Sequence, residues 1–279
     1  MQSAAAAGPV TKVGGSSAGV RTESSVSKDD QSAEPRQYSR GGVFAVWAAA
    51  ALPMGILSWV VAPAIAGPGP SQERFVITLV GAMTVGLVWQ AVLTLILVLR
   101  ERRDPSWTSV RDRLWLRSPR TAERRGGRLW AWVPLYALGL AALDLLIQPL
   151  LFPSAPAARD MGAFLGSPGG QQTFHHAWGL FALIVIMGIF NTVLGEELLF
   201  RGLLLPRMRK GFGRADWVVN GLLFGLYHLH EPWQIPNAIV TGFLCAQPTR
   251  RFRSAWMGIA IHSIETVFFI VVLLPIVLS

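Results

Sequence analysis

The residues best suited to chemistry in this chain are a few ionisable side chains inside long apolar runs. Glu196 and Glu197 are adjacent, and Arg201 follows four residues after Glu197. His228 and His262 lie in later apolar runs. A carboxylate can take a proton from water, while neutral imidazoles can hold that water, bind a metal or stabilise an oxyanion. Together these side chains could activate water.

The two glutamates should play different parts because they point to different faces of one helix. Glu197 and Arg201 share a face through their i, i+4 spacing, whereas Glu196 lies about 100° away around the helix. A charge near the bilayer centre costs roughly 2.5 to 3.5 kcal/mol, so each needs a partner or a function. We expect Arg201 to hold Glu197, and Glu196 to face a cavity as the general base.

Composition and charge pattern indicate a membrane protein. Of the 279 residues, 52% are apolar and 15% are charged, and the net charge is +9. The arginines cluster in short segments between apolar runs, as expected of cytoplasmic loops, and form no basic face with interleaved aromatic residues. We therefore predict an all-α, polytopic membrane helix bundle that does not bind nucleic acid.

Hydropathy predicts about seven transmembrane helices. Their approximate ranges are 43–66, 75–99, 129–152, 177 through the 195–202 motif, 217–229, 235–246 and 256–278. The two short segments could also be re-entrant, and an eighth span is compatible with the pattern. The arginine-rich loops fall on one side only if both short segments cross.

The first 42 residues differ from the rest. Residues 1–42 are rich in Ala, Gly and Ser and contain almost no large apolar residue, so they cannot bury enough surface to fold. We expect a disordered cytoplasmic tail before a membrane domain at 43–279. The Ala-, Arg- and Trp-rich composition suggests a bacterial plasma-membrane protein with its C-terminus outside.

The candidate residues should meet at one depth. Counted from the nearest basic residue of the loops, Glu196, His228 and His262 lie eleven, fourteen and nine residues along their segments, or roughly 13 to 21 Å from the cytoplasmic edge. Asp144 is a further intramembrane acid, which is either functional or a bundle-facing hydrogen-bonding group.

These motifs resemble those of the intramembrane CAAX-protease and bacteriocin-processing family, also called CPBP or Abi, which includes the type II CAAX prenyl endopeptidases. Its Glu-Glu-x-x-x-Arg and Phe-x-x-x-His motifs and the histidine of its His-x-x-x-Asn motif occur here in the same order. The matching residues are Glu196, Glu197, Arg201, Phe224, His228 and His262.

The resemblance implies an endopeptidase core at about 174–278, in which Glu196, His228 and His262 activate the hydrolytic water. Thr266 replaces the asparagine of the third motif. Because threonine lacks the reach and the second donor of the amide, it is less suited to stabilise an oxyanion from that position. Glu265 lies three residues after His262 and could orient its imidazole; alternatively it pairs with an arginine or faces a wet cavity.

Other functions compete with a peptidase. Short, Pro- and Gly-interrupted helices with buried charges also mark transporters and channels, and the Thr266 departure is compatible with an inactive immunity or scaffold protein of the same fold. For a peptidase, the expected substrate is a peptide or membrane protein. His228 and His262 with a glutamate could hold a single Zn²⁺. We favour direct water activation, because Glu196 cannot easily serve as both ligand and base.

Overall fold

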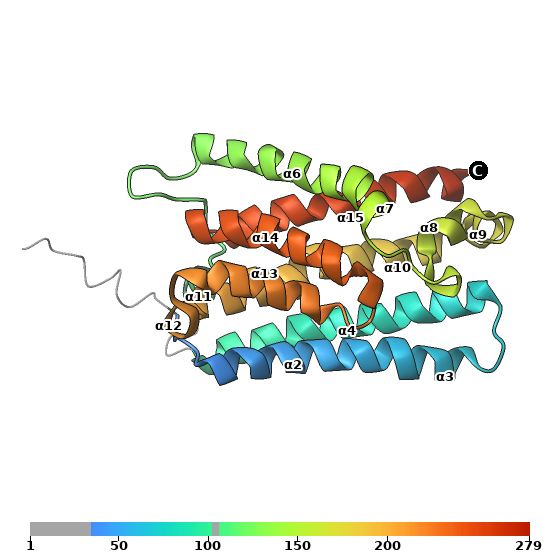
Figure 1. Ribbon diagram of the computed structural model, residues 1–279, viewed down its shortest axis with the longest axis horizontal. Coiled ribbons are helices and arrows are strands. Elements are labelled where there is room, and N and C mark those ends of the chain that lie inside the picture. The colour runs from blue at the N-terminus through green and yellow to red at the C-terminus, as the bar shows by residue number, and fades with distance from the viewer. Residues whose placement is uncertain (1–34, 102–105) are drawn as a thin grey trace, which may run out of the picture. The chain divides into compact units, whose positions relative to one another are not determined.

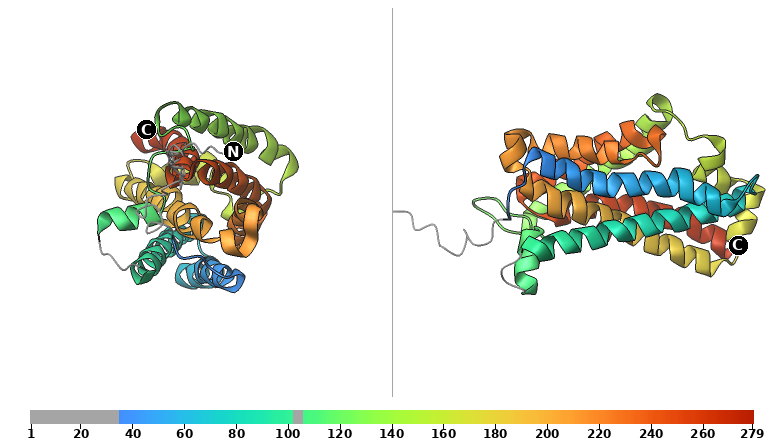
Figure 2. Two further views of the ribbon diagram at one scale, coloured as in Figure 1. Left: turned by 90° about the vertical axis from the view of Figure 1, so that its left-hand side faces the viewer. Right: turned by 90° about the horizontal axis from the view of Figure 1, so that it is seen from below.

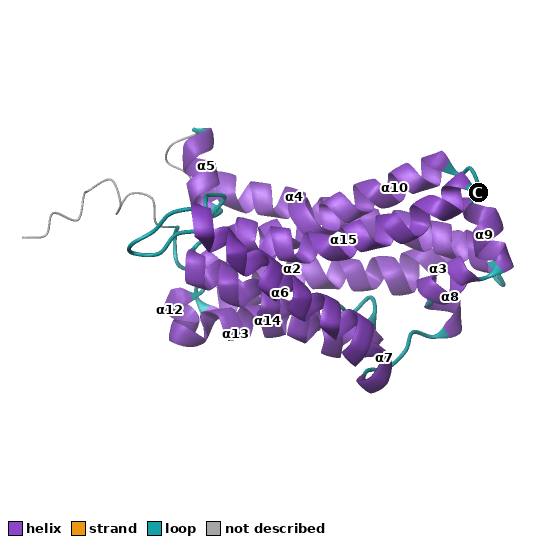
Figure 3. Cartoon of the chain, turned by 90° about the horizontal axis from the view of Figure 1, so that it is seen from above, coloured by secondary structure: helices purple, strands orange, loops and turns teal. Residues whose placement is uncertain are grey.

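The computed structural model describes residues 35–101 and 106–279, and the elements named there are helical (Figure 1; Figure 3). The predicted all-α fold is confirmed. Most of the predicted tail, residues 1–34, lies outside the described residues. The first described helix begins at Arg40, where the Ser39 hydroxyl accepts a hydrogen bond from the backbone N–H of Gly42.

Five helical stretches of the described chain are long and apolar enough to cross a membrane. They are α2 (Arg40–Ile56) with η1 (Leu57–Val61) and α3 (Ala62–Ala66); α4 (Gln72–Glu101); η2 (Gly127–Ala131) with α6 (Trp132–Ala142), η3 (Leu143–Ile147) and α7 (Gln148–Leu151); α10 (Trp178–Ile189) with η5 (Phe190–Gly195), η6 (Leu198–Leu204) and α11 (Leu205–Arg207); and α15 (Ala255–Leu278).

Short helices connect these stretches at the two ends of the bundle. They are α5 (Trp107–Arg113), η4 (Ala157–Arg159), α8 (Met161–Gly166), α9 (Pro168–Phe174), α12 (Arg209–Phe212) and η7 (Gly213–Ala215). The loops around α5 and α12 lie at one end, while the α3–α4 turn, α8, α9 and the C-terminus lie at the other (Figure 1; Figure 3). The arginine-rich loops therefore share one end, and the C-terminus lies at the opposite end.

The two short apolar segments form a helical hairpin. Helix α13 (Asp216–Tyr227) and helix α14 (Ile235–Phe252) are joined by a loop that contains η8 (Pro232–Gln234). The twelve residues of α13 span only about 18 Å, which is shorter than a hydrocarbon core of about 30 Å. The hairpin turn stops short of the end where α3 meets α4 (Figure 1; Figure 2). The predicted count of seven or eight spans is not confirmed, because hydropathy does not reveal where the hairpin turns.

Gly221 lets the two helices of this hairpin pack closely. A Cβ on Gly221 would lie 3.0 Å from the backbone carbon of Gly242 and would collide with Phe243. A glycine at this position permits a close helix approach, as the Gly-x-x-x-Gly spacing with Gly225 predicts.

Three of the four π-helical segments end two residues before a proline. Segment η1 precedes Pro63, η3 precedes Pro149 and η6 precedes Pro206. A proline has no N–H to donate and its ring crowds the carbonyl four residues earlier, so the helix locally widens. The carboxylate pair Glu196 and Glu197 falls between η5 and η6, and Asp144 falls within η3. Such bulges often occur at functional sites.

Ion pairs fix the arginine-rich end of the bundle. Arg207 is fully buried, and its Nη2 lies 2.6 Å from Oε2 of Glu101 at the end of α4. The Tyr38 hydroxyl donates to the same carboxylate at 2.5 Å. Burial and this hydrogen bond raise the pKa of Tyr38 above its usual value.

At the opposite end, Arg159 ties the loop after α7 to the first span. Its Nη1 donates to Ser58 Oγ at 2.8 Å, and its guanidinium lies 3.9 Å from the ring centroid of Trp59. Burial lowers the pKa of Arg159, and the charge of Glu231 opposes that shift.

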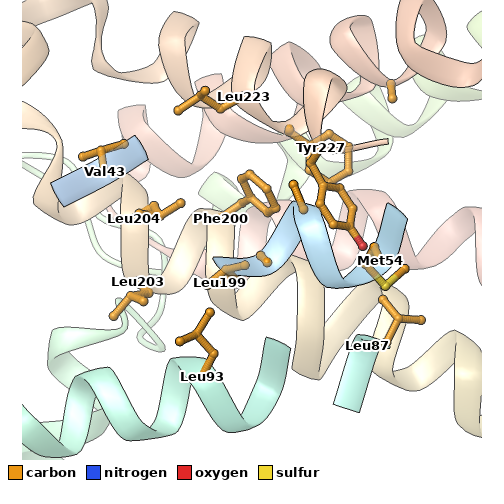
Figure 4. Close-up of a cluster of buried hydrophobic side chains, with 14 of the residues drawn as sticks. Val43, Met54, Leu87, Leu93, Leu199, Phe200, Leu203, Leu204, Leu223 and Tyr227 are labelled. Carbon is orange, nitrogen blue, oxygen red and sulfur yellow. The ribbon is translucent and has the colours of Figure 1, made fainter. Parts of the chain in front are cut away.

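A large hydrophobic cluster packs α10 and its π segments against the first two spans and α13. Figure 4 shows Phe200 and Tyr227 between Met54 and Leu87 on one side and Leu223 on the other. Phe200 is fully buried, and because lipid tails are as apolar as such a side chain, it holds the helices together through van der Waals packing. This packing fixes the helix that carries the carboxylates.

Candidate active site

The helical stretch 178–207 carries Glu196 and Glu197 into the interior of the bundle. Their exposed fractions are 2% and 0%. Gly195 precedes them, and a Cβ at this position would lie 2.9 Å from the Leu87 carbonyl oxygen of α4. The glycine therefore allows α4 to lie directly against the segment that bears both carboxylates.

Glu197 is held by Arg201, as the i, i+4 spacing suggests. Arg201 Nη1 lies 2.8 Å from Glu197 Oε1, and both side chains are fully buried. Arg201 Nη2 donates to the Gly242 carbonyl at 3.3 Å, and the guanidinium lies 4.1 Å from the Phe224 ring centroid. Arg201 thus joins the carboxylate-bearing helix to both helices of the hairpin.

Glu197 also contacts His262 of α15. The Nδ1 atom of His262 lies 3.0 Å from Glu197 Oε1, and its Nε2 lies 3.4 Å from Oε2 of Glu265. Gly258 makes this approach feasible, because a Cβ there would collide with Glu197 Oε2. His262 is therefore placed between two carboxylates.

Glu196 has a separate set of partners. With the Asn191 amide oriented so that its nitrogen faces the carboxylate, Asn191 donates to Glu196 Oε1 at 3.0 Å and to Oε2 at 3.3 Å. Tyr227, whose hydroxyl accepts from Gln90 Nε2 at 2.6 Å, is a polar neighbour of the same carboxylate. The Asn191 amide fixes the orientation of the candidate base.

Sequence reasoning missed Asn191 and Tyr227 as partners of Glu196. Asn191 lies five residues before Glu196, a spacing that an ordinary α-helix does not align but a π-helical turn does. Tyr227 immediately precedes His228. No α-helical spacing in the sequence predicts the pairing of Asn191 with Glu196, which depends on the π-helical segment.

His228 is placed where α13 ends and the chain turns. Its Nδ1 lies 2.9 Å from the Phe224 carbonyl oxygen. The Phe224 ring packs between the two histidines, with centroid distances of 5.1 Å to His228 and 5.6 Å to His262. Since Nδ1 is engaged, Nε2 is the nitrogen of His228 available to a ligand.

A single cavity of about 420 Å³ brings the predicted residues together. Its lining includes Glu196, His228, His262, Glu265 and Asp144. The cavity also has apolar walls from α6 and α15. This combination of an apolar cleft and a few convergent polar groups is typical of ligand sites.

Thr266 lies away from this cavity. Its hydroxyl is 3.3 Å from the Thr192 hydroxyl and 3.5 Å from the Gly188 carbonyl. A Cβ on Gly188 would lie 2.5 Å from Thr266 Cγ2, so this residue packs α15 against α10. The amide that faces Glu196 comes from Asn191 and not from position 266.

The histidines do not form an obvious metal site. Within residues 35–101 and 106–279, no group of three or more His, Cys, Asp or Glu side chains is arranged to hold a metal ion. Both ring nitrogens of His262 face carboxylates, so coordination through His262 would have to displace one of them. The donor set therefore does not fit the zinc site considered from the sequence.

Residues 177–268 match the family model described as type II CAAX prenyl endopeptidase Rce1-like. The matched segment runs from the start of α10 into α15 and contains the first two motifs and the histidine of the third. The resemblance to the type II CAAX prenyl endopeptidases is therefore confirmed over this part of the chain, whereas its bacteriocin-processing part is not. Comparison with curated proteins gives no match, and neither does comparison with solved structures. The family match supports a CAAX-protease-like intramembrane peptidase, a hydrolase, at the level of the family.

Proposed function

We propose that the chain is an intramembrane endopeptidase in which Glu196 activates water to hydrolyse a peptide bond. The observation that carries this proposal is the arrangement of Glu196, His228 and His262 around one buried cavity. The match of residues 177–268 to an endopeptidase family supports the same reaction class. The proposed enzyme is a glutamic peptidase that uses no metal in the reaction.

Glu196 and His228 would hold the attacking water between two acceptors. If His228 Nδ1–H donates to the Phe224 carbonyl, then Nε2 of the neutral ring carries a lone pair toward the cavity. Glu196 would take one proton as the water oxygen attacks the carbonyl carbon. Glu196 would then deliver that proton to the departing amine nitrogen as the C–N bond breaks, leaving a free carboxyl and a free amine.

His262 would stabilise the oxyanion formed during this attack. Because each ring nitrogen faces a carboxylate oxygen, only the imidazolium can offer two N–H donors there. Its Nε2–H faces Glu265, whose side chain is about one-third exposed, so the substrate oxyanion could take the place of that carboxylate. A preorganised donor of this kind stabilises developing charge without reorganisation.

The substrate class and cellular setting extend this proposal. We propose a peptide or membrane-protein substrate that enters from the lipid bilayer, as in peptide maturation or bacteriocin processing. The proposed location is the bacterial plasma membrane, with the N-terminus and the arginine-rich end cytoplasmic and the C-terminus outside.

Cleavage by the purified chain in liposomes would test the proposed function. A set of fluorogenic apolar peptides should be cleaved by the wild-type protein, and Glu196→Gln should reduce turnover by about 100-fold or more, since a general base contributes 10²- to 10⁴-fold. Glu73→Gln is a matched control, because Glu73 is exposed on α4 and outside the cavity. Equal turnover of wild type and Glu196→Gln, or no turnover by either, would contradict the proposal.

A further inference from the structure

A second group of polar side chains lines the same cavity and has no part in the mechanism above. Asp144 lies in the π-helical segment η3, while Asn237 and Thr241 lie one turn apart on α14. Asn237 Nδ2 donates to Asp144 Oδ1 at 3.1 Å. The bond between Asp144 and Asn237 therefore joins the third span to the hairpin at the cavity wall, beside Thr241.

Two acceptor atoms of this group have no partner. Asn237 Oδ1 and Thr241 Oγ1 make no hydrogen bond within the protein, although the two side chains are only 9% and 3% exposed. A helical threonine commonly bonds back to the carbonyl four residues earlier, and Thr241 does not. Both atoms are buried from the open space of the cavity that their residues line. Leaving such atoms unsatisfied destabilises a fold, so a cavity ligand that supplies donors would favour turning them toward it.

The charge of the cavity defines that ligand further. Its lining includes four carboxylic residues, Asp144, Glu196, Glu231 and Glu265, and no lysine or arginine. Asp144 can accept further hydrogen bonds, because a carboxylate offers about four acceptor sites and only the bond from Asn237 occupies one. A cation with several N–H donors and no acceptor would satisfy all three side chains. The ammonium of lysine and the guanidinium of arginine have this chemistry.

We propose that Asp144, Asn237 and Thr241 form a subsite that binds a positively charged substrate side chain, a proposal that rests on the proposed endopeptidase function. The enzyme would then select, among apolar segments, those with a lysine or arginine at a fixed distance from the scissile bond. Bringing such a charge into lipid is costly, and the subsite offsets that cost for the correct substrate.

Binding to the inactive Glu196→Gln protein tests the subsite separately from hydrolysis. The full chain in nanodiscs is titrated with fluorescent apolar peptides in which one lysine is moved position by position, each paired with a norleucine peptide of the same length. At one position, lysine should bind at least about ten-fold more tightly than norleucine, as hydrogen bonds to charged groups allow. Equal binding of both members of every pair would overturn the proposal.

Two further substitutions identify the residues responsible. Asp144→Asn keeps an acceptor for Asn237 and should remove the lysine preference while leaving norleucine binding unchanged; Glu73→Gln should leave both unchanged. Thr241→Val should weaken lysine binding several-fold, yet preserve or raise the melting temperature without peptide, because it deletes an unpartnered hydroxyl. An equal loss for both peptides, or a lower melting temperature for Thr241→Val, would overturn the assignment.

The outcomes separate this proposal from the proposed function. Lysine-selective binding without cleavage by the wild-type protein would overturn hydrolysis and leave the subsite standing. Cleavage without any lysine preference would overturn the subsite alone. Thermal stabilisation of the peptide-free protein by sodium chloride but not choline chloride, abolished by Asp144→Asn, would assign the group to an inorganic cation and overturn the peptide subsite.

Discussion

At the scale of single residues, Glu197 connects more of the site than Glu196 does. It contacts both Arg201 and His262 and is fully buried, whereas Glu196 contacts Asn191 and Tyr227. Glu197 therefore positions two charged groups, and Glu196 faces the cavity with a fixed orientation. This division explains why two adjacent carboxylates can coexist in the bilayer.

Removing the charge of Glu197 should lower the free energy of unfolding of the protein. Glu197→Gln leaves the buried Arg201 without its counter-ion, and breaking a buried pair in this way costs about 3 to 5 kcal/mol. The free energy of unfolding in detergent, measured by denaturant titration with circular dichroism, should fall accordingly. Asp112→Asn is the matched control, because the Arg111–Asp112 pair is partly exposed and such a pair contributes only about 0 to 1 kcal/mol. Equal losses in both variants would contradict this role of Glu197.

Glu265 should influence turnover but not folding. Its carboxylate lies 3.4 Å from His262 Nε2 and is one-third exposed, so it can orient the imidazole without bearing much of the packing. Glu265→Gln should lower kcat/KM by about ten-fold, the lower end of the range known for carboxylates that orient metal-bound histidines. The melting temperature should stay unchanged. Turnover equal to wild type would exclude Glu265 from the site.

At the scale of elements, the sequence could predict the helices and the main residues of the candidate site, but not the local widening of the helices. The i, i+4 rule is enough to pair Glu197 with Arg201. It fails for Asn191 and Glu196, because η5 is π-helical and brings residues five apart onto one face. For the same reason Thr266 could not be placed from its motif alone: the packing of α15 on α10 turns it toward Thr192.

Close contact between α15 and the carboxylate helix depends on Gly258. A Cβ there would collide with Glu197 Oε2 and lie 3.1 Å from Arg201 Cγ, so Gly258→Ala should move α15 and with it His262. We expect a loss of about 1 to 3 kcal/mol in stability, as in other overpacked cores, and reduced peptide turnover. Gly81→Ala on α4 is the control, since nothing lies within 4 Å of a Cβ there. A stability loss of the same size in the control would refute the steric explanation.

At the scale of the whole described molecule, hydropathy distinguishes the long helices from the short ones, but it does not determine whether the short ones cross the bilayer. Residues 217–229 are apolar enough for lipid, yet α13 ends at Tyr227, and the hairpin of α13 and α14 turns before the end where α3 meets α4 (Figure 1). The turn depends on tertiary packing against α2 and η1, where the Ser58 hydroxyl donates to the His230 carbonyl at 3.1 Å and Trp59 Nε1 donates to the Leu229 carbonyl at 2.8 Å. No periodicity in the sequence encodes those contacts.

The depth of the hairpin turn can be measured directly with spin labels. Cys245 is fully buried, so a cysteine introduced at an exposed position would be labelled selectively. In Pro232→Cys, a nitroxide at the exposed hairpin turn should be more accessible to oxygen than to a water-soluble nickel complex, because the turn lies at the depth of the hydrocarbon core. In Pro70→Cys, at the α3–α4 turn, and in Ser118→Cys, at the arginine-rich end, nickel should dominate. If the labels at 232 and 70 showed equal nickel accessibility, α13 and α14 would cross the bilayer and the seven-span topology would be correct.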